Sequence, residues 1–385
     1  MVDHSPTSER VGLRGRAKEM IVQAVRPVLN SEEFARSVRG IFAEFTASAE
    51  FHEVFAAHAR TVFAGFVTSP EFHAGLASAV PFDAIVKAVQ HANWSATRDP
   101  VMMAAETLSI GARVDKGTQI LLAEKYKELL RTKAPLPRFD EVGFRTFSQF
   151  DEDGILLYIF SLIGTTNRRA VEACAGVGFE CNAANLIVNH GWDGMLIDGS
   201  ADNCRVSTQF YTSRSDTQIS PPKIIHTWIE PDTIDWAITV NGFKGEIDLL
   251  TIDLDGIDYW IWKNITSISP RVVVVEYQPW WKADEPYTVK NIPGYWYPNF
   301  AETKPAYVGC SLGAYVKLAR EKGYRLVGCN RNQLNAFFVR NDIAPDILPE
   351  VSAESCLTSR RVTESRDHYR PHVEAQRAAG DWHLA

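Results

Sequence analysis

The sequence has no surplus of positive charge, because its 40 Lys and Arg residues are outnumbered by 47 Asp and Glu residues, giving a formal net charge of −7. Nucleic-acid binding usually requires a concentrated basic face, so we expect no nucleic-acid partner. No apolar run approaches the length of a membrane span, and residues 1–16 lack the apolar core of a signal peptide. These absences predict a globular, cytoplasmic protein without a membrane partner.

Cysteine is sparse and widely scattered, with six residues and no C-x-x-C pair in the chain. No cysteine and histidine spacing is typical of a zinc site, so we predict free thiols in a reducing compartment. The six positions are Cys174, Cys181, Cys204, Cys310, Cys329 and Cys356.

The first third of the chain is predicted to be helical. Three similar segments, 31-SEEF-34, 48-SAEF-51 and 69-SPEF-72, combine a serine cap with an acidic residue in the first turn of a helix. A later helix is expected at 115–131, and the prolines of 134-APLPR-138 end the pattern. We therefore predict an all-α N-terminal domain at 1–133 and a linker at 134–147. Stripes of phenylalanine suggest that the domain forms a homodimer or covers the active site.

From about residue 145, short β runs alternate with helical segments. This alternation predicts a mostly parallel sheet with helices on both faces, in a domain spanning 148–345. The last two runs are close together and suggest one antiparallel strand at the edge, while 346–385 is expected to be a partly helical surface tail. The predicted strands are 170-AVEAC-174, 194-GMLID-198, 223-KIIHT-227, 247-IDLLTID-253, 271-RVVVVEY-277, 324-YRLVGC-329 and 334-LNAFFVR-340.

A glycine loop follows the first of these strands, in 171-VEACAGVGFECN-182. Gly176 and Gly178 permit close approach of the backbone to a ligand, and Asp198 at the end of the second strand can bind ribose hydroxyls. The pattern favours a nucleoside-containing cofactor over a plain tight turn. An NAD fingerprint would have a third glycine at Cys181 and asks for no acidic residue at Glu172, so S-adenosylmethionine (SAM) is favoured.

The order Glu172, Cys174, Gly176 and Gly178 resembles the first motif of class I SAM-dependent methyltransferases, except that Cys174 stands where glycine is commonest. The segments 148-SQFDEDGIL-156, 180-ECNAANLIVNHGWDGMLIDG-199, 249-LLTIDLDGIDYWIW-262 and 273-VVVEYQP-279 resemble the FkbM-like and related uncharacterised methyltransferases. The resemblance covers about residues 145–340 and implies a seven-stranded, Rossmann-like α/β fold that binds SAM.

The resemblance also assigns the cofactor site. In that family the acidic residue of the first strand orients the cofactor loop, and the acidic end of the second strand binds ribose. Gln149 should lie over the cofactor and His226 near the adenine, although a histidine that is simply hydrogen-bonded at a strand end is an equal alternative for His226. The candidate cofactor-binding residues are Gln149, Glu172, Gly176, Gly178, Asn182, Asp198, Gly199, His226 and Asp253.

Three further carboxylates point to the chemistry. Asp253 and Asp255 follow the fourth strand and Glu276 ends the fifth, so they should meet at the cofactor, where a carboxylate can orient an acceptor and take its proton. We predict that these three residues are catalytic. Carboxylates this close need compensation by a cationic substrate, a metal or solvation in a turn.

A metal is the alternative interpretation of the same three residues. An EF-hand is excluded, because Ile257 occupies a ligand position and Asn264 replaces the last glutamate. Related sugar O-methyltransferases use acidic residues after these strands, but usually with an adjacent acidic pair where this sequence has Glu276 followed by Tyr277. A magnesium site is therefore predicted less strongly than a cationic substrate.

Aromatic residues near the carboxylates could bind a guanidinium or ammonium ion through cation–π contacts. We predict that Asp258, Tyr277, Trp280 and Trp281 bind the substrate. The alternative makes Trp260 and Trp262 packing residues of a helix, with Asp258 in its solvated first turn. The insertion at 282–309 is expected to close over the acceptor.

Together these features predict a SAM-dependent methyltransferase that acts on a small polar metabolite, preferably on a guanidino or amino nitrogen. One alternative is a metal-dependent O-methyltransferase of a sugar or natural product. A second is a non-catalytic SAM-binding module, which would not need carboxylates at the methyl group.

Overall fold

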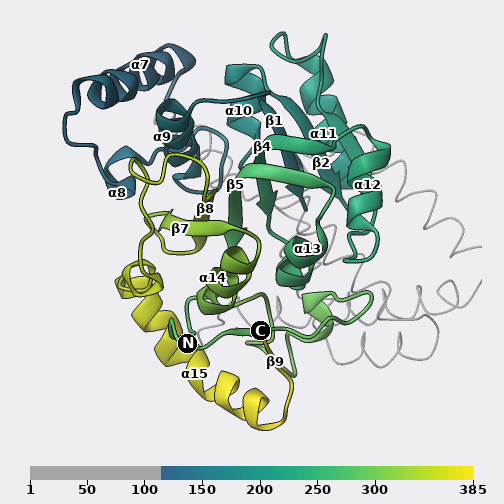
Figure 1. Cartoon of the computed structure of the whole chain (residues 1–385). Coiled ribbons are helices and arrows are strands. Elements are labelled where there is room, and N and C mark those ends of the chain that lie inside the picture. Colours follow the sequence, from purple (N-terminus) through teal and green to yellow (C-terminus); the bar gives the residue numbers. More distant parts are fainter. Residues whose placement is uncertain (1–113) are drawn as a thin grey trace, which may run out of the picture. The chain divides into compact units, whose positions relative to one another are not determined.

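The computed structural model describes residues 114–385 (Figure 1). The three predicted helix starts at residues 31–72 lie outside the described residues. No helix within 114–385 is long and apolar enough to cross a membrane.

A seven-stranded sheet forms the centre of this part of the chain, with the strand order β3-β2-β1-β4-β5-β8-β7. All seven predicted strands are present, which confirms the Rossmann-like class I methyltransferase fold expected for the domain. Their bounds are β1 Arg169–Ala173, β2 Asp193–Asp198, β3 Lys223–His226, β4 Gly245–Ile252, β5 Ile268–Glu276, β7 Tyr324–Cys329 and β8 Asn335–Arg340.

The antiparallel strand does not lie at the edge of the sheet, where the sequence predicts it. The antiparallel strand is β8, which pairs with both β5 and β7, so it lies inside the sheet and β7 forms the edge. Phe337 and Phe338 of β8 are buried in the two separate cores on opposite faces of the sheet. A strand with apolar side chains on both faces gains most from an interior position, because there both of its faces and both of its edges are covered.

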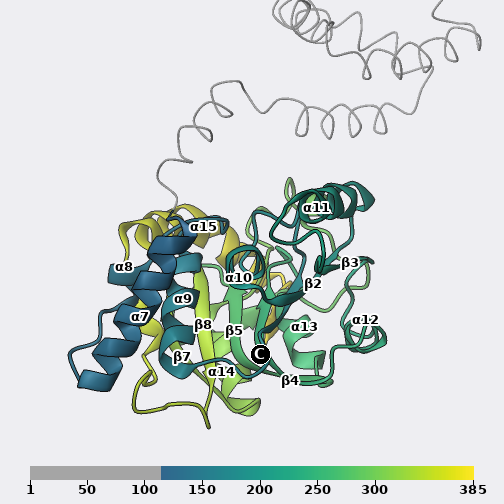
Figure 2. The same ribbon diagram turned by 90° about the horizontal axis from the view of Figure 1, so that it is seen from above.

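Helices cover both faces of the sheet (Figure 2). The core on one face includes residues of α9 Glu152–Ile163, α10 Ala184–His190 and α11 Ala201–Ser213, together with the short α8 Phe139–Val142. The opposite core includes residues of α12 Ile234–Val240, α13 Asp258–Asn264 and α14 Leu312–Glu321. The carboxyl ends of the parallel strands are left for the candidate site.

Helix α7, Lys116–Thr132, belongs to this unit and not to a separate N-terminal domain. Asp115 caps its start by accepting a hydrogen bond from the Thr118 N–H. The fully buried Gln119 amide donates to the Asn185 side chain of α10, at 3.1 Å, and the Tyr126 ring packs edge-on against Tyr158 of α9 at 4.8 Å. The domain boundary predicted near residue 134 therefore does not separate α7 from the sheet domain. The buried residues of α7 contact α9 and α10, the helices that cover one face of the sheet.

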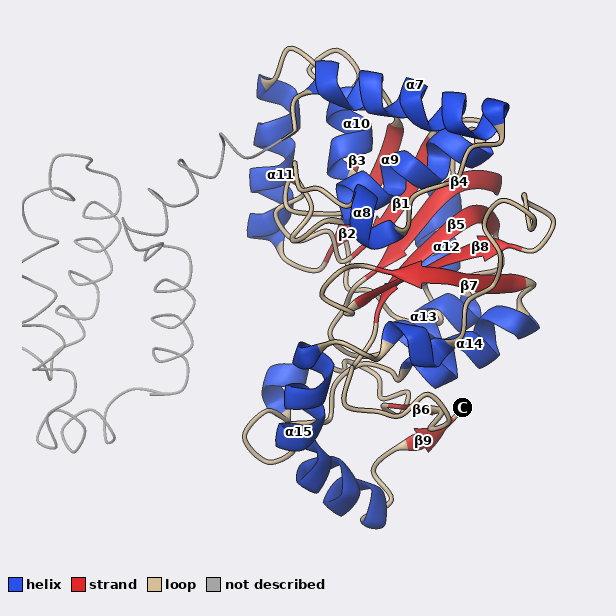
Figure 3. Ribbon diagram, turned by 90° about the vertical axis from the view of Figure 1, so that its left-hand side faces the viewer, coloured by secondary structure: helices blue, strands red, loops and turns tan. Residues whose placement is uncertain are grey.

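The predicted surface tail packs against the predicted insertion (Figure 3). Strand β9, His383–Leu384, pairs with β6, Tyr287–Thr288, and α15, Arg360–Ala378, places Arg370 against Glu285 with bidentate bonds of 2.7 and 2.8 Å. Two short 3-10 helices complete these segments, η2 at Tyr297–Asn299 in the insertion and η3 at Ala353–Cys356 in the tail. The tail is helical in part, as predicted, but it is a structural support of the insertion.

Candidate active site

A cavity of about 160 Å³ lies at the carboxyl ends of the central strands. Five of its ten lining residues are predicted cofactor residues: Gln149, Glu172, Gly176, Asn182 and Asp253. The other five are Cys174, Ala175, Glu180, Cys181 and Asn335. The structure thus brings the glycine loop and the end of β4 to one cavity, as the sequence predicts.

Glu172 holds the loop between β1 and α10. Its carboxylate is buried and accepts the N–H groups of Asn182 at 2.9 Å and Ala183 at 2.7 Å. Burial raises the pKa of Glu172, and the two backbone bonds oppose that rise. The side chain therefore fixes the loop path through backbone contacts, which is the orienting position that the family resemblance implies.

The loop itself requires left-handed backbone at three positions. Gly176 and Gly178 have φ angles of 56° and 76°, and a Cβ atom at Gly178 would lie 2.0 Å from the Ser207 Oγ atom. Cys174 also has a positive φ, of 66°. Because Cys174 has a Cβ atom, its backbone keeps the strain that a glycine at this position would relieve.

Asp198 joins the end of β2 to the same loop. Its Oδ2 atom accepts the Gly176 N–H at 2.9 Å, and its Oδ1 atom accepts the Ser200 N–H at 2.8 Å and the Asn203 side-chain amide at 3.0 Å. The His226 Nε2 atom lies 3.2 Å from the Gly199 carbonyl oxygen. That contact supports the alternative in which His226 is simply hydrogen-bonded at a strand end.

Asp253, Asp255 and Glu276, which we call the acidic trio, come together at the ends of β4 and β5. One oxygen from each carboxyl group lies within 4.8 Å of the others. Loss of hydration raises the pKa of Asp253 to about 7 and that of Glu276 well above its usual range. The neighbouring Asp253 carboxylate also raises the pKa of Glu276, because two negative charges this close repel one another. Asp255 has a φ of 54°, which adds backbone strain at this point.

Asp258 has a different position from the one predicted. It is buried, and its carboxylate accepts the N–H groups of Leu254 at 2.6 Å and Gly256 at 2.8 Å. Burial raises the pKa of Asp258 to about 6. The sequence-based interpretations of Asp258, as a substrate-binding residue or as part of a solvated helix turn, therefore do not describe its position. Its two carboxylate oxygens instead accept backbone N–H groups of the loop that carries Asp255.

The three aromatic residues predicted to bind the substrate are buried elsewhere. The Tyr277 hydroxyl donates to the Cys356 carbonyl at 2.6 Å, Trp280 packs on Tyr369 at 4.5 Å, and Trp281 packs edge-on against Trp382 at 4.8 Å. This packing does not support the prediction that Tyr277, Trp280 and Trp281 bind the substrate, because all three side chains are buried against the tail. The packing alternative is correct for Trp262, which is fully buried in the core.

Sequence analysis did not identify the acidic residues that position the segment before α9. Asp153 is buried and accepts the N–H groups of Thr146, Phe147 and Ser148, and burial raises its pKa to about 6. These bonds set the position of the neighbouring Gln149. The signal in the sequence was the acidic start of a helix directly after a polar loop.

Asn335 and the neighbouring Glu152 were also missed. The Asn335 amide donates to Glu152 at 2.7 Å, and Asn335 lines the cavity from the start of β8. The available signal for Asn335 was a polar residue directly before a run of four apolar residues in a predicted strand.

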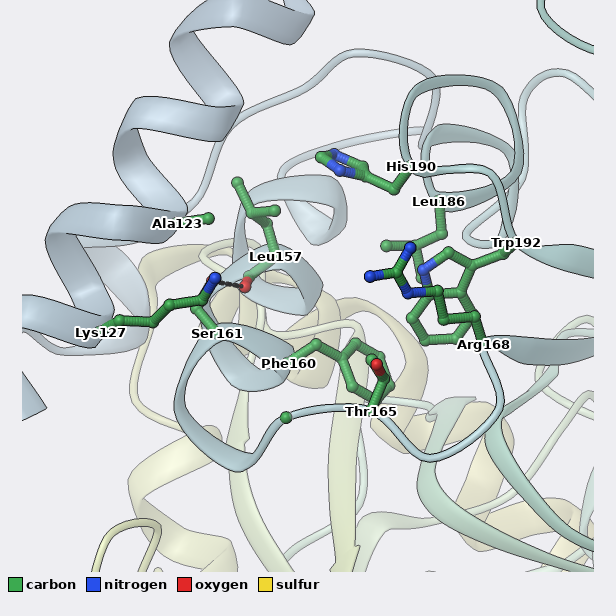
Figure 4. A pocket seen from close by; sticks show the side chains of 11 residues that line it. Ala123, Lys127, Leu157, Phe160, Ser161, Thr165, Arg168, Leu186, His190 and Trp192 are labelled. Carbon is green, nitrogen blue, oxygen red and sulfur yellow. Dashed lines mark hydrogen bonds between the residues drawn. The ribbon is translucent and has the colours of Figure 1, made fainter.

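A second cavity, of about 230 Å³, lies between α7, α9 and α10, beside residues that directly precede β1 and β2 (Figure 4). It contains none of the predicted site residues. Lys127, on its wall, is paired with Glu124 at 2.7 Å, and burial lowers the pKa of His190 to about 4, which leaves that ring neutral. The cavity is therefore separate from the candidate active site.

No protein-family model and no curated protein matches this chain. Among solved structures, it is similar to magnesium protoporphyrin IX methyltransferase from Synechocystis with bound SAM, at 10% identity over 49% of this chain and 77% of that one, with a TM-score of 0.32. The N-terminal domain of EvdMO1 with bound S-adenosylhomocysteine (SAH) gives 13% identity over 59% and 96% of the two chains, with a TM-score of 0.33. A putative sarcosine dimethylglycine methyltransferase from Galdieria sulphuraria gives 13% identity over 45% and 60%, with a TM-score of 0.30. At such values the likeness carries no argument, so the fold assignment rests on strand order and on the glycine loop.

Proposed function

We propose that the protein is a SAM-dependent methyltransferase that acts on a small polar acceptor. The observation that carries this proposal is the shared cavity, where the glycine loop and Glu172 meet Asp253. Methyl transfer needs an acceptor lone pair in line with the methyl carbon and the sulfur, so positioning supplies much of the rate. The acidic trio lies where it could orient such an acceptor and receive its proton.

The favoured acceptor is a guanidino or amino nitrogen. Support comes from the negative charge of the acidic trio, because no basic side chain among residues 114–385 forms an ion pair with Asp253, Asp255 or Glu276. A cationic acceptor would supply the missing charge and could form bidentate hydrogen bonds. The buried positions of Tyr277, Trp280 and Trp281 remove the aromatic part of the earlier argument, so the proposal rests on the carboxylates.

The second candidate is a metal-dependent O-methyltransferase of a sugar or other hydroxylated natural product. The observation that favours it is the convergence of three carboxylate oxygens within 4.8 Å, since hard divalent cations prefer oxygen ligands. Asp253, Asp255 and Glu276 would hold the ion, which could polarise a hydroxyl group of the acceptor. A non-catalytic SAM-binding module is disfavoured, because cofactor binding alone does not require the strained, like-charged trio.

Calorimetry and a methyl-transfer screen test these proposals. The protein should bind SAH and SAM but not NAD, and radiolabelled SAM should label a compound in a panel of arginine, other guanidines, amines and hydroxylated metabolites. NAD binding without SAH binding would overturn the proposal. Turnover that survives EDTA supports a nitrogen acceptor, whereas loss with EDTA and recovery with magnesium would establish the metal-dependent alternative.

A further inference from the structure

Two exposed tryptophans connect the β3 loop to the insertion. Trp228 follows β3, and Trp296 immediately precedes η2. Their rings are stacked, with centroids 5.7 Å apart and an interplanar angle of 30°, while 44% and 46% of the two residues remain exposed. The Glu230 Oε1 atom also accepts the Gly294 N–H at 2.8 Å, so the same two segments are joined twice.

The Trp228 ring lies against the proposed cofactor side of the cleft. A Cβ atom added at Gly199 would lie 2.8 Å from the Trp228 Cε3 atom, so only glycine leaves room for the ring there. Gly199 directly follows Asp198, whose carboxylate holds the glycine loop through the Gly176 N–H. Adenosine bound near Asp198 and Gly199 would therefore meet the exposed part of Trp228.

The residue before Trp296 makes the matching contact on the acceptor side. A Cβ atom at Gly256 would lie 2.4 Å from the Tyr295 Cε1 atom, so the Tyr295 ring lies directly over this glycine. Gly256 follows Asp255 of the acidic trio, and its N–H is held by Asp258. Tyr295 is buried, its ring stacks on Phe300 at 5.1 Å, and its hydroxyl donates to the Tyr307 carbonyl.

We infer that the contacts Gly199–Trp228–Trp296–Tyr295–Gly256, here called the aromatic latch, make the position of the Asp255 loop depend on the bound cofactor. The inference rests on the proposed function. Cofactor that fixes Trp228 also fixes Trp296 by stacking, and the adjacent Tyr295 then fixes Gly256 and Asp255. Such coupling is transmitted by contacts between packed side chains. It requires that cofactor binding beside Trp228 reduce the mobility of the loop that carries Gly256 and Asp255. Trp296 is thus a positioning residue that prepares the acceptor side once the cofactor is present.

Hydrogen exchange of the full chain with and without SAH tests the latch without knowledge of the acceptor. SAH should slow amide exchange in peptides covering 254–257 and 292–300 by roughly fivefold or more. In the Trp296→Ala variant, SAH should still bind, because the hydrogen bonds of Asp198 go to Gly176, Ser200 and Asn203 and the ring next to Gly199 is that of Trp228, but the slowing at 254–257 should be lost. Trp296→Phe keeps an aromatic ring and should restore part of the slowing.

The matched control is Trp236→Ala in α12, which removes a more exposed tryptophan, 66% accessible, that has no stacking partner in the described residues. This variant should behave as the unmodified protein does. If SAH binds the unmodified protein and leaves exchange at 254–257 unchanged, the latch is wrong and the proposed function stands. Full slowing in Trp296→Ala would also overturn the latch, whereas failure of the unmodified protein to bind SAH would overturn the proposed function and the latch together.

Discussion

The two halves of the candidate site differ in how their acidic side chains are compensated. At the ends of β1 and β2, the carboxylates of Glu172 and Asp198 accept backbone N–H groups at 2.7–2.9 Å. At the ends of β4 and β5, the carboxyl groups of Asp253, Asp255 and Glu276 instead lie within 4.8 Å of one another, and burial raises the pKa of Asp253 to about 7. The proposed cofactor half is therefore compensated by the backbone of the protein itself, whereas the acidic trio forms no ion pair with a basic side chain among residues 114–385, which is why we propose a cationic acceptor or a metal there.

The largest expected effect comes from Glu276→Gln, which keeps the size of the side chain and removes its ability to ionise. If the acidic trio holds a cationic acceptor, affinity for the acceptor and turnover should fall together, by roughly a hundredfold or more if general-base help is also lost. SAH affinity should be unchanged, because the cofactor half keeps its own bonds. Radiolabel transfer and calorimetry on the same preparation measure the two properties. Full-rate transfer to a neutral sugar by this variant would show that the acidic trio serves another purpose.

A smaller effect is expected at the other half. Asp198→Ala leaves the Gly176 and Ser200 N–H groups without their acceptor and removes the proposed ribose contact. SAH binding should weaken by about 1–3 kcal/mol, which is roughly 5- to 150-fold in Kd. Calorimetry measures this loss, and Glu276→Gln is the matched control in which another carboxylate of the cleft is removed. Equal loss of SAH affinity in both variants would contradict the division of the site into two halves.

The smallest effects concern stability, and they should have opposite signs. In Glu172→Gln, the side-chain amide has only one oxygen to accept the backbone N–H groups of Asn182 and Ala183, and its N–H₂ group would face the other N–H donor. The buried N–H group left without an acceptor should lower the Tm by several degrees. Glu276→Gln removes a buried carboxyl group whose pKa is raised in the folded protein; such a group ionises more readily in the unfolded chain and so destabilises the fold at pH 8, and its removal should raise the Tm at that pH. Differential scanning calorimetry measures both shifts. A Tm that falls in both variants would show that the acidic trio is compensated in the folded protein.

The pH dependence follows from the same contrast. The folded-state pKa of Asp253, about 7, lies above its unfolded value near 3.8, so the unfolded chain releases this proton first as the pH rises. The free energy of unfolding should therefore decrease between about pH 4 and 7 through this residue. Asp253→Asn should remove that part of the slope, and denaturant unfolding at several pH values would detect it.

The same contrast explains what the sequence could and could not predict. The glycine loop, Glu172 and Asp198 act through contacts within or between neighbouring strands and loops, so their order along the chain was sufficient. The convergence of Asp253, Asp255 and Glu276 also followed from the rule that parallel strands end at one edge of the sheet. These parts depend on local pattern and on sheet topology alone.

The errors lie where distant segments meet. Trp280 and Trp281 follow the acidic trio in sequence, but they are buried against Tyr369 of α15 and against Trp382, about a hundred residues further on. Helix α7 was assigned to the wrong unit because its contacts with α9 and α10 leave no sign in its own periodicity. The interior position of β8 likewise depends on the burial of its apolar side chains on both faces of the sheet. The packing of helices and strands from the whole domain determines that burial, and the sequence of β8 alone does not reveal it.

The seam between the insertion and the tail contains several polar atoms that have no partner. The indole N–H groups of Trp280, Trp281 and Trp382 are buried without an acceptor in the described residues, and so are the Arg366 Nε atom and the Gln376 Oε1 atom. Each unmade hydrogen bond costs about 1–3 kcal/mol, whereas the strands of the sheet pair their backbone N–H and C=O groups with one another. Local unfolding is easiest in regions with many buried polar groups that lack hydrogen bonds, because such groups lower the free energy needed to open the region. The tail should thus separate from the insertion as a cooperative unit while the sheet and its glycine loop stay folded. A partly unfolded form would then keep the proposed cofactor site and lose the proposed acceptor side.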